Sequence, residues 1–189
     1  MSKKKISDMN ENELGKLFPI IIESYNPKWP QIFADEKITI EKSFADIEFN
    51  AIYHIGSTAI EGISAKPTID MILEIPTEQD IAPITDALKQ LDYHAIPRPD
   101  KPMPSMMYAK GYTPEGFKGQ AFHIHLRYPG EHKEIIFRDY LRKSHIARKE
   151  YEALKMISAI EFRNNREKYT NAKTDFILKI LEKAKIAFP

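Results

Sequence analysis

A glycine–serine turn followed by a carboxylate is the part of this sequence best suited to chemistry. Gly56, Ser57 and Thr58 follow one apolar stretch, and Asp70 lies near the start of a second. Glycine lets the backbone approach an anion without a Cβ in the way, and amides that open a helix point at phosphate oxygens. A carboxylate on a neighbouring strand can hold a divalent cation against those oxygens. The pattern indicates a phosphate and metal site, although a glycine used only for a tight turn gives the same residues.

The charged residues around this turn favour the same interpretation. Lys66 would add a positive charge beside a phosphate, and Asp70 stands in an apolar run, where carboxylates are rare unless paired or metal-bound. A two-metal phosphoryl-transfer site uses further carboxylates, but Ile72 occupies the position of the second acid. Glu74 shares the face of Asp70 but lies roughly 13 Å along the strand. We interpret Glu74 as a surface charge at the strand end.

Two histidines that are two residues apart form a second candidate group. A strand over 121–128 would place His123, His125 and Arg127 on one face and apolar side chains on the other. We expect both imidazoles to reach Asp70, as metal ligands or as acid–base groups. Arg127 favours anion binding on this face. The alternative is a solvent-facing strand whose polar side carries histidines.

Two arginines one helical turn apart form the third group. Arg138 and Arg142 share a face of a predicted helix, where they could grip a phosphate chain. The alternative is a solvated face with local ion pairs to Asp139. The same four-residue spacing recurs in two tyrosine–lysine pairs, Tyr151 with Lys155 and Tyr169 with Lys173. Packing explains these tyrosines as well as ligand binding does.

The elements that must position these residues alternate between helices and strands. We expect helices at 10–22, 30–45 and 77–91, strands at 48–55, 68–75, 105–112 and 121–128, and helices from 133 onward with a break at 164–165. Closely spaced prolines between 97 and 104 exclude a helix there. Helices on either side of a few strands predict an α+β fold with a small sheet and a helical C-terminal third.

Composition restricts the classes of protein that fit. The 189 residues are enough for one domain with its own core, which we take as 1–189. A net charge of +1 argues against a broad nucleic-acid-binding surface. Because the chain has no cysteine, it has no disulfides, thiolate metal sites or cysteine nucleophiles. No signal peptide or membrane-spanning stretch is visible, so we expect a cytoplasmic protein without a membrane partner.

Taken together, these residues resemble the GrpB family of small bacterial proteins. The resemblance rests on blocks along nearly the whole chain, at 17–20, 25–29, Phe33, 54–59, Gly62, 65–67, 69–70, 123–125, 137–142, 151–155, Tyr169 and Lys173. A local departure is Glu61, where the family usually has proline. The resemblance implies a nucleotidyltransferase-like fold, with a small mixed sheet flanked by helices.

Two functional hypotheses follow. In the first, the protein binds a nucleoside triphosphate and transfers a nucleotidyl group to a small acceptor with the help of magnesium, manganese or zinc. The phosphate-binding residues would be Gly56, Ser57, Thr58, Lys66, Arg127, Arg138 and Arg142; the catalytic residues His54, Asp70, His123 and His125; and the metal ligands Asp70, His123 and His125. In the second, a nucleotide- or phosphate-binding module has no transfer chemistry, which the missing acid at Ile72 favours. The sequence specifies neither the nucleotide, the acceptor nor the oligomeric state.

Overall fold

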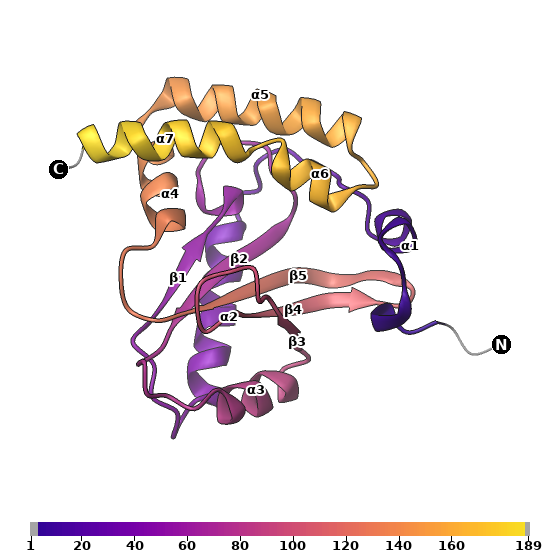
Figure 1. The fold of residues 1–189 in the computed structure, drawn as a ribbon, viewed down its shortest axis with the longest axis vertical. Helices are drawn as coiled ribbons and strands as arrows, with labels where there is room; N and C mark the ends of the chain where they lie inside the picture. The colour runs from indigo at the N-terminus through magenta and orange to yellow at the C-terminus, as the bar shows by residue number, and fades with distance from the viewer. Residues whose placement is uncertain (1–3, 188–189) are drawn as a thin grey trace.

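The computed structural model describes residues 4–187, and within them helices and strands follow one another as Figure 1 shows. In chain order the elements are the 3₁₀ helix η1 (Ile6–Asp8), α1 (Glu11–Leu17), α2 (Trp29–Ser43), β1 (Ala51–Ile55), the 3₁₀ helix η2 (Ser57–Ala59), β2 (Thr68–Glu74), α3 (Ile81–Gln90), β3 (His94–Pro97), β4 (Met106–Thr113), β5 (Gly116–Arg127), α4 (Lys133–Lys143), α5 (His145–Glu161), α6 (Arg166–Asn171) and α7 (Thr174–Ala187). Over this described range, no helix is both long and apolar enough to cross a membrane.

The strands form one mixed sheet in the order β1-β2-β5-β4-β3. β2 and β5 are parallel, and the other neighbouring pairs are antiparallel. The register places Asp70 opposite Ile55 of β1 and opposite His123 of β5. The predicted α+β class, with a mixed sheet flanked by helices, is confirmed.

One face of this sheet packs against α2 and α3. Its core contains alternate apolar residues of β2 and β5, namely Ile69, Met71, Leu73, Phe122, Ile124 and Leu126. Because neighbouring side chains of a strand point to opposite faces, Asp70, His123 and His125 lie on the other face. The alternation predicted for 121–128 is therefore confirmed.

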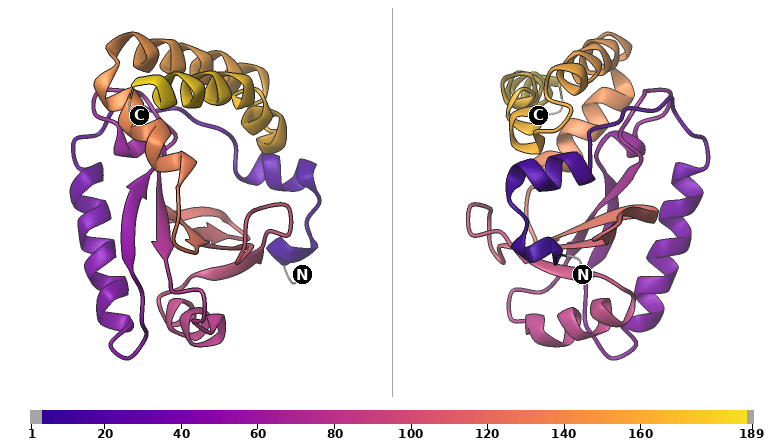
Figure 2. Two further views of the ribbon diagram at one scale, coloured as in Figure 1. Left: turned by 60° about the vertical axis from the view of Figure 1, so that its left-hand side comes forward. Right: turned by 90° about the vertical axis from the view of Figure 1, so that its right-hand side faces the viewer.

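The C-terminal helices lie at the end of the sheet where β1 ends and β2 begins (Figures 1 and 2). Their apolar side chains pack against Ile60 and Ile63 in the loop that joins these two strands. The predicted break at 164–165 is present, and Asn165 caps α6 with its side chain. Further breaks at Ser144, which caps α5, and at 172–173 divide the segment into α4, α5, α6 and α7 rather than into two helices.

Other elements differ from the sequence prediction in their bounds. The first helix ends at Leu17 instead of 22, because the chain then extends and the amide of Ile20 donates to the carbonyl of Arg163. The helix predicted at 77–91 begins at Ile81, after the cap Asp80. The strand β3 was not predicted; all its residues are exposed and it ends in Pro97, so it lacks the usual buried alternation.

Gly15 brings α1 into direct contact with the turn between α5 and α6. A Cβ on Gly15 would lie 1.7 Å from the carbonyl oxygen of Asn164, which is backbone and cannot rotate away. In an ordinary helix, alanine is about 1 kcal/mol more favourable than glycine, but overpacking here costs about 1–3 kcal/mol. We expect Gly15→Ala to lower Tm in a circular dichroism melt by about 2–12 °C for a chain of this size. Lys16→Ala, at an exposed position of the same helix, should leave Tm nearly unchanged; a higher Tm for Gly15→Ala would contradict the close contact.

Candidate functional site

The contact between Gly56 and Asp70 is the centre of the candidate site. Gly56 has φ 71° and ψ −173°, a combination essentially restricted to glycine. A Cβ at this position would lie 2.6 Å from Oδ2 of Asp70. After Gly56, the chain forms the single 3₁₀ turn η2. Backbone conformation and the neighbouring carboxylate therefore both require glycine here.

Asp70 begins a chain of hydrogen bonds across three strands. Its Oδ1 lies 2.9 Å from Nδ1 of His123, and Nε2 of His123 lies 2.8 Å from the hydroxyl of Tyr112 on β4. Burial alone would raise the pKa of Asp70, but the hydrogen bond from His123 and the positive charge of Lys66 hold that pKa well below its usual value. Burial lowers the pKa of His123, against the effect of Asp70. An ionised Asp70 only accepts hydrogen bonds, so neutral His123 donates from Nδ1 and accepts the Tyr112 hydroxyl proton at Nε2.

The predicted metal site of Asp70, His123 and His125 is not formed. Both ring nitrogens of His123 are engaged, with Asp70 and with Tyr112. The ring of His125 shares the face, but its centroid lies 6.4 Å from that of His123, and burial lowers its pKa to about 4. Between residues 4 and 187, no three histidine, aspartate or glutamate side chains are grouped to hold a metal ion. This correction follows from Asp70 and His123 binding each other.

His54 and Thr58 are directed away from the Asp70 face. The ring of His54 stacks on Phe33 of α2 at 4.7 Å, and its Nε2 lies 3.0 Å from Oγ1 of Thr58. That hydroxyl donates to the carbonyl of Thr68 at 3.0 Å. Burial lowers the pKa of His54 to about 4. His54 therefore does not take its predicted catalytic position, because strand alternation turns it to the α2 face. Thr58 does not form its predicted phosphate contact, because its hydroxyl links β1 to β2.

Arg138 and Arg142 hold the backbone around the glycine turn instead of facing an open phosphate site. Arg138 donates from Nη1 to the carbonyl of His54 at 2.6 Å. Arg142 donates from Nε and Nη2 to the carbonyl of Ala59 at 3.0 and 2.8 Å. Both guanidinium groups also pair with Asp139. These contacts correct their predicted role as phosphate ligands: they fix both ends of the turn that carries Gly56.

Arg127 and Glu74 belong to a separate polar cluster further along the strands. Arg127 is opposite Glu74 in the register, and its Nη2 lies 3.0 Å from Oε1 of Glu134. Glu74 contacts Nε2 of His132 at 2.5 Å, and its side chain is only 13% exposed. The interpretation of Glu74 as a surface charge is therefore wrong. The predicted phosphate role of Arg127 is corrected as well, because its guanidinium is paired and lies four residues along β5 from His123.

Lys66 stays beside Asp70, and the structure adds two cations that the site prediction did not include. Burial and the charge of Arg166 lower the pKa of Lys66 to about 7, while Asp70 opposes the shift. Burial lowers the pKa of Lys173 to about 8, again against the effect of Asp70. Arg166 begins α6 and Lys173 precedes α7. The spacing of Tyr169 and Lys173 drew attention in the sequence, but only the folding of the C-terminal helices brings these residues to the site.

Two buried tyrosines lie on the same side as these cations. Tyr151 of α5 interacts with Ser57, and burial raises the pKa of its phenol to about 12 despite that hydrogen bond. Burial likewise raises the pKa of Tyr169, whose ring centroid lies 4.0 Å from Nζ of Lys173. Both phenols are neutral at physiological pH. Gly56, Ser57, Lys66, Asp70, His123 and His125 thus remain together on one side of the molecule, and their functional roles stay predictions.

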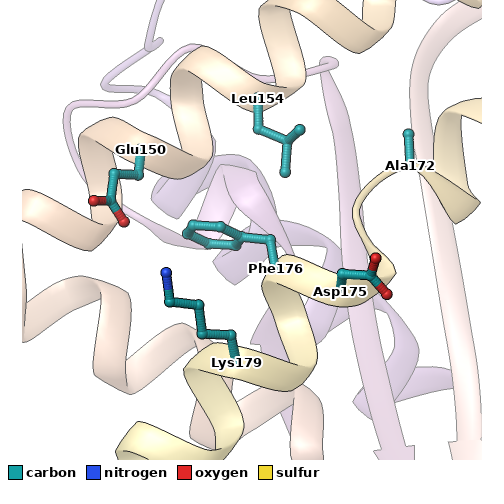
Figure 3. Close-up of a pocket in the computed structure, with 6 residues that line it drawn as sticks. All are labelled: Glu150, Leu154, Ala172, Asp175, Phe176 and Lys179. Carbon is teal, nitrogen blue, oxygen red and sulfur yellow. The ribbon is translucent and has the colours of Figure 1, made fainter.

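A surface hollow of about 450 Å³ lies elsewhere, between α5 and α7 (Figure 3). Its lining residues are Glu150, Leu154, Ala172, Asp175, Phe176 and Lys179. None of the predicted site residues lines it, and the ring of Phe176 stacks on Tyr151 at 5.5 Å, between the hollow and the site. We place the candidate site around Asp70, where the chemically versatile side chains converge.

Comparison with known proteins identifies the family. The family model described as GrpB protein matches residues 19–183. This chain belongs to the GrpB family. The match includes the glycine turn, the Asp70–His123 pair and the cations of the C-terminal helices.

Several GrpB relatives share most of this chain. The glutamate-rich protein GrpB of Alkalihalophilus pseudofirmus is 31% identical over 166 residues, which cover 86% of this chain and 94% of that protein. The UPF0157 protein YqkA of Bacillus subtilis is 32% identical over 177 residues, 85% of this chain, but this chain spans only 46% of that relative. A crystal structure of conserved protein GrpB from Enterococcus faecalis has a TM-score of 0.74 at 23% identity, and the match covers 87% of this chain and 96% of that one. The last comparison shows a shared fold, and none of these names specifies a reaction or a ligand.

Proposed function

We propose that this GrpB protein has a nucleotidyltransferase-like fold and binds a nucleoside triphosphate through its phosphates beside Asp70. The contact of Gly56 with Asp70 is the observation that carries this proposal. Because Gly56 has no Cβ, nothing separates the backbone turn from the carboxylate of Asp70. Ser57 and Lys66 lie on the same side of the molecule as Asp70. A glycine turn, a hydroxyl, a cation and an ionised carboxylate are the groups that a metal–phosphate complex requires.

We propose transfer of a nucleotidyl group to a small acceptor as the reaction of this site: the acceptor would bond to the α-phosphorus, the bond between the α- and β-phosphates would break, and pyrophosphate would leave. A magnesium, manganese or zinc ion that arrives with the triphosphate would be held by Asp70 and by phosphate oxygens, because magnesium often binds through one carboxylate and phosphates. The ion would neutralise charge on the phosphates. His123 is neutral and oriented by Asp70, as a general base is, and its Nε2 accepts from Tyr112. A proton leaving the acceptor would pass to the Tyr112 oxygen as Tyr112 gives its own proton to His123.

Binding without transfer is the second candidate function. Ile72, in the position of the second acid, is fully buried and no three-ligand metal group exists within residues 4–187. A single carboxylate would hold one metal ion less firmly than a pair. These observations favour a nucleotide- or phosphate-binding module.

Asp70→Asn separates the two candidates. Without a metal ion the Asp70 carboxylate repels phosphates, and with one it anchors the complex. We expect Asp70→Asn to weaken triphosphate binding in the presence of magnesium, manganese or zinc by about tenfold or more, or about 1.4 kcal/mol. Metal-free binding should be equal or slightly tighter. Isothermal titration calorimetry with each metal and without metal measures both affinities.

Asp86→Asn is the matched control for this titration, because Asp86 is exposed on α3. It should bind as the wild type does. If Asp70→Asn and wild type bind equally under all metal conditions, Asp70 holds no metal and the transfer proposal gives way to the binding module. If the wild type binds no triphosphate at all, both candidates are wrong.

A further inference from the structure

Three cations on the Asp70 side of the site have no carboxylate partner. Lys66, Arg166 and Lys173 come from the loop before β2, from α6 and from the turn before α7. Among residues 4–187, none of them has a carboxylate oxygen within 4.0 Å. Arg166 and Lys173 both lower the pKa of Lys66, and Asp70 raises it, so Lys66 interacts with both cations and with Asp70.

Arg166 carries the clearest sign of a missing partner. Its guanidinium lies over the ring of Tyr112, with Cζ 5.2 Å from the ring centroid, and its Nη2 donates to the Tyr112 hydroxyl over a long 3.5 Å. Its Nε is buried and has no hydrogen-bond partner, and no other buried side-chain nitrogen or oxygen of the described residues shares this condition. A buried donor without an acceptor costs free energy, which an anionic oxygen would recover.

Lys66 and Lys173 are half-buried, and each interacts electrostatically with Asp70. Nζ of Lys173 lies 4.0 Å from the ring centroid of Tyr169, so an aromatic face rather than an anion is its nearest support. Burial lowers the pKa of both amines, to about 7 for Lys66 and about 8 for Lys173. Moving an ammonium group out of water is unfavourable unless an anion compensates it. An anion bound beside these amines would therefore favour their protonated forms.

We propose that Lys66, Arg166 and Lys173 form a subsite for a dianionic phosphate group. This inference rests on the proposed nucleotide binding, because it assigns the cations that hold the terminal phosphates. When all three are protonated, their positive charges outnumber the single negative charge of Asp70 by two. This excess of positive charge matches a phosphate dianion better than a carboxylate. Arg166 presents a planar donor group suited to phosphate oxygens, and the lysines add point charges. The arginines of α4 do not serve this purpose, since backbone carbonyls occupy them.

Calorimetric titration of the full chain with inorganic pyrophosphate tests this subsite. Arg166→Gln and Lys173→Gln should each weaken pyrophosphate binding by about tenfold or more, as expected for the loss of a charge-assisted contact. Arg163→Gln and Lys168→Gln are matched controls, because both residues are exposed in the same segment, and they should bind as the wild type does. Circular dichroism verifies that each variant is folded. If Arg166→Gln does not fold, Arg166→Lys and Lys173→Gln are used to test the subsite in its place.

A parallel titration with a nucleoside triphosphate separates this inference from the proposed function. The subsite is overturned if the two variants bind each anion as tightly as the wild type does, both triphosphate and pyrophosphate. Nucleotide binding would then stay intact. Pyrophosphate binding that both variants lose, without any triphosphate binding by the wild type, would support the subsite and overturn nucleotide binding. Failure of the wild type to bind either anion would overturn both. A nucleoside without phosphates should not displace pyrophosphate.

Discussion

Replacing Gly56 with alanine is expected to lower the free energy of unfolding by about 2–5 kcal/mol and to abolish phosphate binding. The first cause is the backbone, whose φ of 71° and ψ of −173° are strained for any residue with a Cβ. The second is the added methyl group, which would lie 2.6 Å from Oδ2 of Asp70. To relieve this overlap, the carboxylate must move from His123 or the turn must move from β2. Urea denaturation measures the stability and calorimetry measures the loss of binding.

Gly119→Ala is the matched control for this variant. Gly119 also has a positive φ, of 69°, but a Cβ there would meet nothing within 4 Å. Gly119→Ala should therefore lose only the stability that backbone strain costs, about 1–2 kcal/mol, and it should bind phosphate as the wild type does. Equal losses of stability in the two variants would mean that the close approach of Gly56 to Asp70 is unimportant.

The free energy of unfolding is expected to rise with pH between about 8 and 9.5, with Lys155 contributing a slope of about 1.4 kcal/mol per pH unit. Lys155 is 1% exposed, donates to the carbonyl of Ser64, and has no carboxylate partner within residues 4–187. Burial lowers its pKa from 10.5 to about 7, although Glu152 opposes the shift. Between these two values the unfolded chain binds a proton that the folded chain lacks, so raising the pH favours folding. Lys66 and Lys173 act in the same direction.

Lys155→Met should remove the contribution of Lys155 from this slope. The variant leaves the Ser64 carbonyl without its donor, which lowers stability equally at every pH and does not change the slope. Urea denaturation at several pH values measures the slope. Lys149→Met, at an exposed position of the same helix, should keep the wild-type slope. A Lys155→Met slope equal to that of the wild type would show that Lys155 remains charged when buried.

Strand alternation gave the most reliable predictions from sequence. It placed His123 and His125 on one face and the apolar residues of 121–128 on the other, as the structure confirms. The same rule, applied to β1, would have placed His54 beside Ile52 and away from the Asp70 face, so a signal for that correction existed. The parallel pairing of β2 with β5 joins segments far apart in the chain, and no local pattern specified that Asp70 would lie opposite His123.

The cations illustrate what sequence patterns could not reveal. Arg138 and Arg142 share the predicted helix face, but their partners are the carbonyls of His54 and Ala59, and backbone acceptors leave no trace in side-chain patterns. Arg166 reaches Tyr112 of β4 because the chain breaks after α5 and begins the separate helix α6. The single-domain organisation, the cytoplasmic location and the identity of the ligands stay predictions.

Phosphate binding beside Asp70 is tested most directly by a nuclear magnetic resonance titration with a nucleoside triphosphate, followed through the assigned histidine ring signals of the ¹⁵N-labelled protein. We expect saturable shifts of His123, which contacts Asp70, and of His125 on the same face. His145, exposed at the start of α5, should not move. Saturable shifts at His145 with His123 and His125 unchanged, or no shift at any histidine, would contradict phosphate binding at this site.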